Sequence, residues 1–280
     1  MIMKKLIIIL TAILLLAGGE RFGYCYLDGK LAHEKMIYPV VRITHGMFGG
    51  SGTAIYSKIG KVGYSTYILT NHHVIASAIS VESKWDSDLQ KEAKQEKRSI
   101  VYVESFKYRE LSDPIGTLKI EAEIILYDQD ADLALIKLRS EDKFPYIAEL
   151  LPKDGKIFTM DETVAVGCSL LWPPVPTRGV ITRKNFQVDS LPYHTSSSQI
   201  IYGNSGGAMF TGDGKLIGIP SMVAIIGWGT PIVHMGLFIP LDRIYKWLEK
   251  EDYQFIYDPN KKEDECLKVR EDKIKKKKEK

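Results

Sequence analysis

Short apolar or alternating apolar–polar segments recur along most of this chain. Before residue 144 they cover 36–43, 53–56, 66–70 and 118–124. After residue 156 they cover 163–167, 179–182, 216–219, 223–226 and 237–240. Many short strands separated by Gly and Pro turn signals are typical of an all-β barrel or sandwich. The pattern therefore predicts an all-β protein in two halves, with residues 145–156 as a polar link between them.

Three other segments carry a different signal. Apolar residues three or four apart over 242–248 predict a closing helix after the last strand. Within an insertion at 79–115, Trp85, Leu89 and Ala93 recur every four residues in a charged background, which predicts a short surface helix. The glycine-rich run at 49–52 reads as a turn.

Composition adds bounds on partners and cofactors. The 280 residues carry a net charge of +3, and the lysine-rich segment 261–280 alone contributes +4, from ten basic and six acidic residues. The remainder is close to neutral, so no nucleic-acid partner is expected. The segment itself reads as a disordered, solvated end, with binding to an anionic membrane or nucleic acid as the alternative. Cys25, Cys168 and Cys266 are too scattered for a disulfide framework or metal knuckle, so neither metal nor cofactor is expected.

The N-terminus has the pattern of an export signal. Lys4 and Lys5 precede a run over 6–16 that is apolar except for Thr11, followed by small residues at 17–19. This predicts a signal peptide at 1–19, with an uncleaved membrane anchor as the alternative. In both cases the rest of the chain leaves the cytosol, for the periplasm or the exterior. Residues 20–37 form a lead-in.

Three polar residues stand out against the strands. His73 follows an apolar strand, Asp132 leads directly into one, and Ser205 lies in the run Gly-Asn-Ser-Gly-Gly. Taken singly, each has a structural reading as a strand-end histidine, a polar turn or an ordinary loop. A carboxylate entering an apolar strand, however, needs a hydrogen-bond donor. A serine nucleophile needs a base, and that base needs an orienting group, so together the three form a candidate catalytic set.

Their motifs resemble a known family. The runs at 70–74, 132–136 and 203–207, with Gly-Ser-Gly-Thr at 50–53 and Phe-Ile-Pro at 238–240, closely resemble the HtrA/Do (Deg) branch of the chymotrypsin-like serine proteases. The resemblance covers roughly residues 38–250. It implies two packed six-stranded antiparallel β-barrels, at about 38–144 and 157–240, with a C-terminal helix and a charged tail at 251–280. His73 and Asp132 would come from the first barrel and Ser205 from the second.

The resemblance also implies roles for these residues. Ser205 would attack the scissile carbonyl of a protein or peptide substrate, His73 would act as the base, and Asp132 would orient it. The backbone N–H groups of Gly203 and Ser205 would form the oxyanion hole. The primary pocket would be lined by Gln199, Ile200, Ser221, Val223 and Gly236, none of them acidic, which favours an apolar and aliphatic side chain before the scissile bond.

Several features qualify the resemblance. Pro220 stands where many relatives carry Asn, in a segment that pairs with substrate. About 40 residues follow residue 240, which is too short for a C-terminal PDZ domain. No Ile-Val-Gly-Gly start of the kind that zymogens need is present. HtrA-like proteins often form trimers, so a homo-oligomer is one option here. The competing function is a catalytically silent, protease-fold binding or chaperone-like module.

Overall fold

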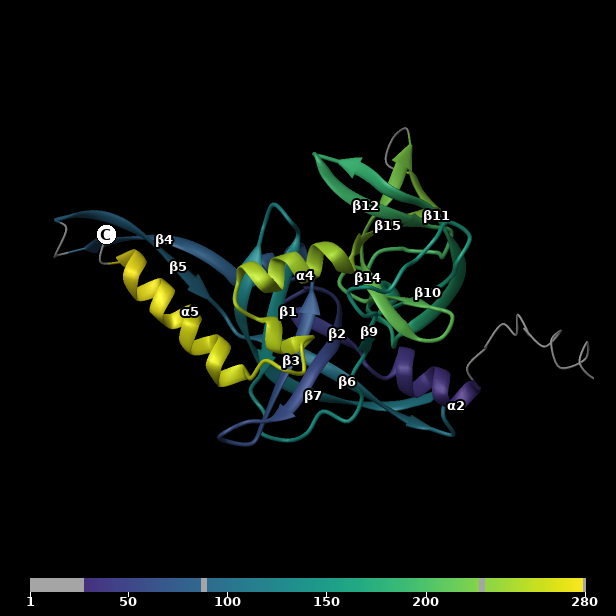
Figure 1. Ribbon diagram of the computed structural model, residues 1–280, viewed down its shortest axis with the longest axis horizontal. Helices are drawn as coiled ribbons and strands as arrows, with labels where there is room; N and C mark the ends of the chain where they lie inside the picture. The colour runs from purple at the N-terminus through teal and green to yellow at the C-terminus, as the bar shows by residue number, and fades with distance from the viewer. Residues whose placement is uncertain (1–27, 87–89, 227–229, 279–280) are drawn as a thin grey trace, which may run out of the picture.

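The structure, a computed structural model, describes residues 28–86, 90–226 and 230–278 (Figure 1). The predicted signal peptide and Cys25 lie outside these ranges. No helix among the described residues is long and apolar enough to cross a membrane.

The first half of the chain forms a closed six-stranded antiparallel barrel. Its strands follow the order β1-β2-β3-β8-β7-β6 around the barrel. Their bounds are β1 Val40–His45, β2 Phe48–Ile59, β3 Tyr64–Thr70, β6 Val101–Arg109, β7 Asp113–Asp128 and β8 Leu133–Leu138. Side chains alternate across a strand. Val41 and Ile43 therefore enter the barrel core with Ile68 and Ile136, whereas Val40 packs outside it.

The second half repeats this architecture. Strands β10 to β15 form a ring of antiparallel pairs, because β13 pairs with both β10 and β14. The short β9 (Glu149–Leu150) adds in parallel to β14. The bounds are β10 Glu162–Gly167, β11 Val175–Val188, β12 Leu191–Ser196, β13 Ala208–Thr211, β14 Lys215–Ile226 and β15 Thr230–Pro240. The all-β fold of two barrels is thereby confirmed. Because β9 lies within the predicted link at 145–156, part of that link also joins the second sheet.

The largest apolar cluster lies outside both barrel interiors. It joins Tyr67 and Leu69 of the first barrel to Ile219 and Ile239 of the second, and to Leu248 of helix α4 (Leu241–Lys250). The predicted closing helix is therefore present, and its apolar face packs between the two barrels (Figure 1). This shared core fixes how the barrels face each other.

Two predictions in the first half were wrong. The expected surface helix is an antiparallel hairpin of β4 (Ile79–Asp86) and β5 (Lys91–Arg98), in which Trp85 pairs with Glu92; Leu89 lies outside the described residues. Strand pairing overrides the helix propensity of the charged second strand. The run 49–52 is part of strand β2 rather than a turn. Its small residues allow close approach, since a Cβ on Gly50 would lie 2.8 Å from Val74.

Several short helices and one longer helix, α5, complete the described chain. The lead-in contains α2 (Gly29–Ala32) and the π-helix η1 (His33–Ile37). The others are α3 (His72–Ile75), η2 (Ala76–Ala78), η3 (Ser169–Leu171), η4 (Gln254–Ile256) and α5 (Glu263–Lys278).

The charged C-terminal segment differs from the expected disordered end. Tyr253, Phe255 and Cys266 are buried in the shared core. The Tyr67 hydroxyl donates to Glu263 Oε1 at 2.8 Å, which ties the start of α5 to the first barrel. The buried residues before and within α5 therefore make this segment part of the fold.

Candidate active site at the junction of the two barrels

The first barrel brings His73 and Asp132 together. His73 lies in the short helix α3, directly after β3, and Asp132 precedes β8. Both carboxylate oxygens of Asp132 lie 2.9 Å from His73 Nδ1, and the His73 backbone N–H donates to Oδ1 at 3.1 Å. Asn71 Nδ2 donates to the Asp132 carbonyl oxygen at 2.9 Å. These contacts hold the imidazole with Nδ1 towards the carboxylate.

A residue of the second barrel also binds this carboxylate. Ser221 Oγ donates to Asp132 Oδ2 at 2.6 Å. Burial raises the pKa of Asp132, but the hydrogen bonds from His73 and Ser221 lower it by more, so this pKa lies below its usual value. The carboxylate is therefore ionised at neutral pH. The sequence suggested Ser221 only as a pocket wall, and no local signal could have revealed a contact across 89 residues.

Ser205 follows a tight turn in the second barrel. Asn204 N–H donates to the Ile201 carbonyl at 3.1 Å, and Gly203 has a φ of 95°. Positive φ at the third position of a turn requires glycine, as in a type II turn. Leu170 N–H donates to the Tyr202 carbonyl at 2.8 Å. Since a trans peptide points its C=O and N–H in opposite directions, the Gly203 N–H faces away from Leu170.

The Ser205 hydroxyl has a partner other than histidine. Its Oγ donates to the Ser221 carbonyl oxygen at 3.2 Å. Within the described ranges, no hydrogen bond joins Ser205 Oγ to His73. The structure thus brings all three predicted residues to one junction, linked through Ser221, while the hydroxyl is turned towards β14.

Ser51 of the first barrel binds the serine loop of the second. Its hydroxyl donates to the Gly203 carbonyl at 2.6 Å and accepts from Cys168 N–H at 2.7 Å. Its backbone N–H donates to the Ser205 carbonyl at 2.9 Å, and the residue is fully buried. The sequence contained Ser51 only as one letter of a glycine-rich motif, and its role emerges from contacts between distant segments.

The expected pocket residues lie on three segments of the second barrel. Ser221 and Val223 are on β14, and Gly236 pairs with Val223 from β15. A Cβ on Gly236 would lie 2.4 Å from Ile200 Cδ1, so these two residues are in direct contact. The Gln199 side chain is exposed and its carbonyl accepts from Thr177 Oγ1 at 2.8 Å. Within this group, Ile200 and Val223 contribute apolar side chains, whereas the exposed Gln199 and the buried Ser221 contribute polar ones.

Two neighbouring groups are unsuited to act in place of these residues. Burial raises the pKa of the Cys168 thiol to about 12, so it stays protonated and a poor nucleophile. His72 stacks on Tyr127 at a ring-centroid distance of 5.0 Å, and burial lowers its pKa. The stacking on Tyr127 gives His72 a structural role.

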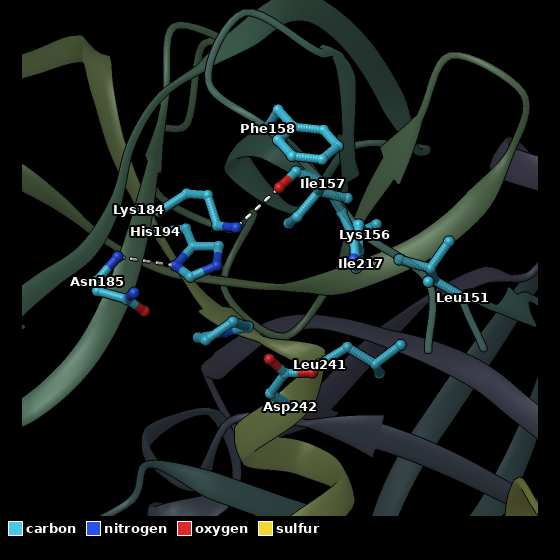
Figure 2. A pocket seen from close by; sticks show the side chains of 12 residues that line it. Leu151, Lys156, Ile157, Phe158, Lys184, Asn185, His194, Ile217, Leu241 and Asp242 are labelled. Carbon is cyan, nitrogen blue, oxygen red and sulfur yellow. Dashed lines mark hydrogen bonds between the residues drawn. The ribbon is translucent and has the colours of Figure 1, made fainter. Parts of the chain in front are cut away.

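A separate hollow of about 230 Å³ lies in the second barrel, beside the start of α4 (Figure 2). There the ring of His194 accepts through Nδ1 from Asn185 N–H at 3.2 Å, and Lys184 Nζ donates to the Ile157 carbonyl at 2.8 Å. Burial lowers the pKa of His194. None of the predicted site residues lines this hollow.

Residues 50–219 match the family model of the trypsin-like peptidase domain. The chain belongs to this family, a family of serine endopeptidases. It is 27% identical over 216 residues to the magnetosome formation protease MamE of Paramagnetospirillum magneticum, covering 72% of this chain and 26% of MamE. With the periplasmic pH-dependent serine endoprotease DegQ of Escherichia coli it shares 28% identity, covering 68% of this chain and 34% of DegQ.

A solved structure agrees with the fold. The HtrA-type protease AlgW with tripeptide superposes with a TM-score of 0.57 at 21% identity, covering 82% of this chain and 64% of AlgW. The similarity to the HtrA branch is thus present in both sequence and fold. The chain spans about a quarter to a third of the length of the two curated relatives named here.

Proposed function

We propose that this chain hydrolyses peptide bonds in protein substrates through Ser205, His73 and Asp132. The observation that carries the proposal is the approach of both Asp132 oxygens to His73 Nδ1 at 2.9 Å. This arrangement leaves Nε2 as the nitrogen that exchanges a proton with the nucleophile. It also places a negative charge where an imidazolium would form.

The reaction begins with rotation of the Ser205 side chain from the Ser221 carbonyl towards His73. Ser205 Oγ then attacks the scissile carbonyl while His73 Nε2 takes its proton. The resulting imidazolium is stabilised by Asp132, and His73 passes the proton to the leaving amine. Water, activated by the same imidazole, hydrolyses the acyl-enzyme and frees Ser205.

The developing oxyanion is stabilised by the N–H groups of Gly203 and Ser205. Within the described ranges neither N–H has a hydrogen-bond partner, whereas the carbonyls of both residues are held by Ser51. Each such donor contributes on the order of 10²–10³ in rate.

The acyl-side pocket takes a small aliphatic side chain. Ile200 is 2% exposed and in contact with Gly236, which limits the depth between the pocket walls. Val223 adds apolar surface, and the described pocket residues include no acidic group to pair with Lys or Arg. A buried cation would therefore be left without a partner.

The setting is extracytoplasmic quality control or processing of proteins. The basic and apolar pattern of residues 1–19 supports export, and DegQ is by its name periplasmic. Membrane association through the uncleaved N-terminus and a homo-oligomeric assembly are compatible extensions of this proposal.

Fluorophosphonate labelling of the full chain tests the triad. Wild type should be labelled, while Ser205→Ala and His73→Ala should not. Circular dichroism of all three proteins controls for folding. The orientation of Ser205 Oγ towards Ser221 favours one competing function, a silent binding module. A folded wild-type chain that stays unlabelled, also after addition of unfolded protein substrates, would establish that alternative.

A further inference from the structure

Three large apolar side chains lie exposed on the proposed oxyanion turn and on the segment η3 to Trp172 that is bonded to it. Leu170 is 59% exposed, Trp172 is 65% exposed and Tyr202 is 74% exposed. Leu170 N–H donates to the Tyr202 carbonyl at 2.8 Å, and Tyr202 directly precedes Gly203. We refer to these three residues as the apolar rim. The backbone of the apolar rim is therefore hydrogen-bonded, through Leu170, to the turn that would hold the oxyanion.

The backbone that presents the rim is strained. Leu170 has a φ of 52° and Leu171 has a φ of 63°, both left-handed and neither a glycine. Such a conformation costs about 1–2 kcal/mol per residue. Strained residues of this kind cluster at functional sites, where the surrounding structure holds them. In this conformation the side chain of Leu170 is exposed to solvent, whereas the side chain of Leu171 lies beside Gly49 of β2.

The position of the rim relative to Ser205 defines which part of a substrate it meets. On one side, β14 contacts the nucleophile loop, since Gly206 N–H donates to the Pro220 carbonyl at 3.0 Å and Ser205 Oγ to Ser221. That side carries the proposed acyl-side pocket. On the other side, β2 and η3 meet the same loop through Ser51, which bonds Cys168 and Ser205.

A peptide that enters along β14 and crosses Ser205 therefore leaves over η3 and Tyr202. We propose that the apolar rim binds apolar side chains at the first and second positions after the scissile bond. The proposal rests on the proposed protease function and adds the leaving-group side of the substrate to it. Trp and Tyr suit this role because they bury large areas at low entropy cost.

The test uses the full chain and a set of quenched fluorescent peptides. All share one acyl side, and the two residues after the scissile bond are Leu, Phe, Ser, Asp or Lys. Wild type should cleave the Leu and Phe peptides with a kcat/KM at least about 10-fold above the Ser peptide, the range expected for one apolar contact. The double variant Leu170→Ser/Trp172→Ser and the single variant Tyr202→Ser should each reduce this ratio to below about 3-fold.

Two controls separate the possible failures. Ile115→Ser alters a side chain that is 60% exposed on β7 and should keep the wild-type ratio. Fluorophosphonate labelling has no peptide leaving side and should be equal in wild type and rim variants. Absence of labelling in wild type would refute the protease function itself. Normal labelling with equal cleavage of all peptides, or an unchanged ratio in the labelled rim variants, would refute the role of the rim alone.

Discussion

The substitution Ser51→Ala should reduce catalysis although Ser51 is fully buried and outside the proposed triad. Its hydroxyl satisfies the Gly203 carbonyl at 2.6 Å and the Cys168 N–H at 2.7 Å. Alanine leaves both backbone groups unpaired, at about 1–3 kcal/mol each, so stability falls by about 2–6 kcal/mol where no relaxation occurs. The proposed oxyanion turn therefore loses two supports. The Gly203 carbonyl loses its donor, and the N–H of Cys168, which directly precedes η3, loses its acceptor. Leu170 of η3 in turn donates to the Tyr202 carbonyl, so both changes reach the turn.

The catalytic cost follows from that turn. A displaced Gly203 N–H removes one of the two proposed oxyanion donors, and such a donor is worth about 10²–10³ in kcat. We expect kcat to fall about 100-fold with KM changed by less than about 3-fold, since the described residues of the proposed acyl-side pocket on β14 and β15 have no hydrogen bond to Ser51. The assay is steady-state cleavage of a peptide at low temperature. Rates are normalised to the folded fraction measured by circular dichroism.

Thr53 provides a matched control on the same strand. It is fully buried like Ser51, but its Oγ1 has no hydrogen-bond partner among the described residues. Thr53→Val therefore removes a buried hydroxyl without breaking a bond, and it should leave kcat unchanged and stability equal or higher. Wild-type kcat in folded Ser51→Ala, or an equal loss in both variants, would show that Ser51 does not position the turn.

Further predictions at Asp132, His194 and Tyr67 concern catalysis, titration and the C-terminal segment. Asp132→Asn should lower kcat by about 10⁴, as loss of the orienting carboxylate does in other triads. The pKa of Asp132 is lowered in the folded protein, so its ionised carboxylate stabilises the fold above about pH 3.9. This stabilisation is lost as pH falls through the folded pKa. In urea unfolding at several pH values, Asp132→Asn should not show that loss. Burial lowers the pKa of His194, so wild type should lose stability as pH falls below about 6.5, and His194→Asn should lose less; identical pH profiles would contradict this. Tyr67→Phe removes the hydrogen bond to Glu263 and should lower the free energy of unfolding by about 1–3 kcal/mol, measured by urea unfolding. An unchanged unfolding midpoint would show that this hydrogen bond does not stabilise the chain.

The local pattern was sufficient to predict an all-β protein in two halves, whereas the two barrels and the roles of the three motif residues were inferred from the resemblance to a known family. Alternation such as Val41 and Ile43 marks a strand face without knowledge of its partner, and Asp132 needed a donor wherever the chain placed it. The roles of Ser51 and Ser221 could not be found in this way. Each is defined by bonds to segments far away in the sequence, where neither residue type is unusual.

The C-terminal helix α5 is a second feature that the sequence pattern alone could not predict. Its composition is that of a solvated tail, and most of its residues are charged. The structure instead buries Cys266 and pairs Arg270 with Glu251 and Lys273 with Asp252, the latter at 2.7 Å. Basic residues of α5 thus form ion pairs with the acidic residues that follow α4. This arrangement depends on tertiary contacts and not on hydrophobic periodicity.

The packing of the C-terminal segment on the first barrel also has a consequence for folding during synthesis. The ring of Tyr67 lies 5.6 Å from that of Phe255 and 5.9 Å from that of Tyr253. These partners are made almost 190 residues after Tyr67, so the outer layer of the first barrel stays open while the second is translated. Contacts of such long sequence separation form slowly. The junction of the two barrels therefore acquires its final packing only after Phe255 has been made, so a site at this junction cannot be complete before then.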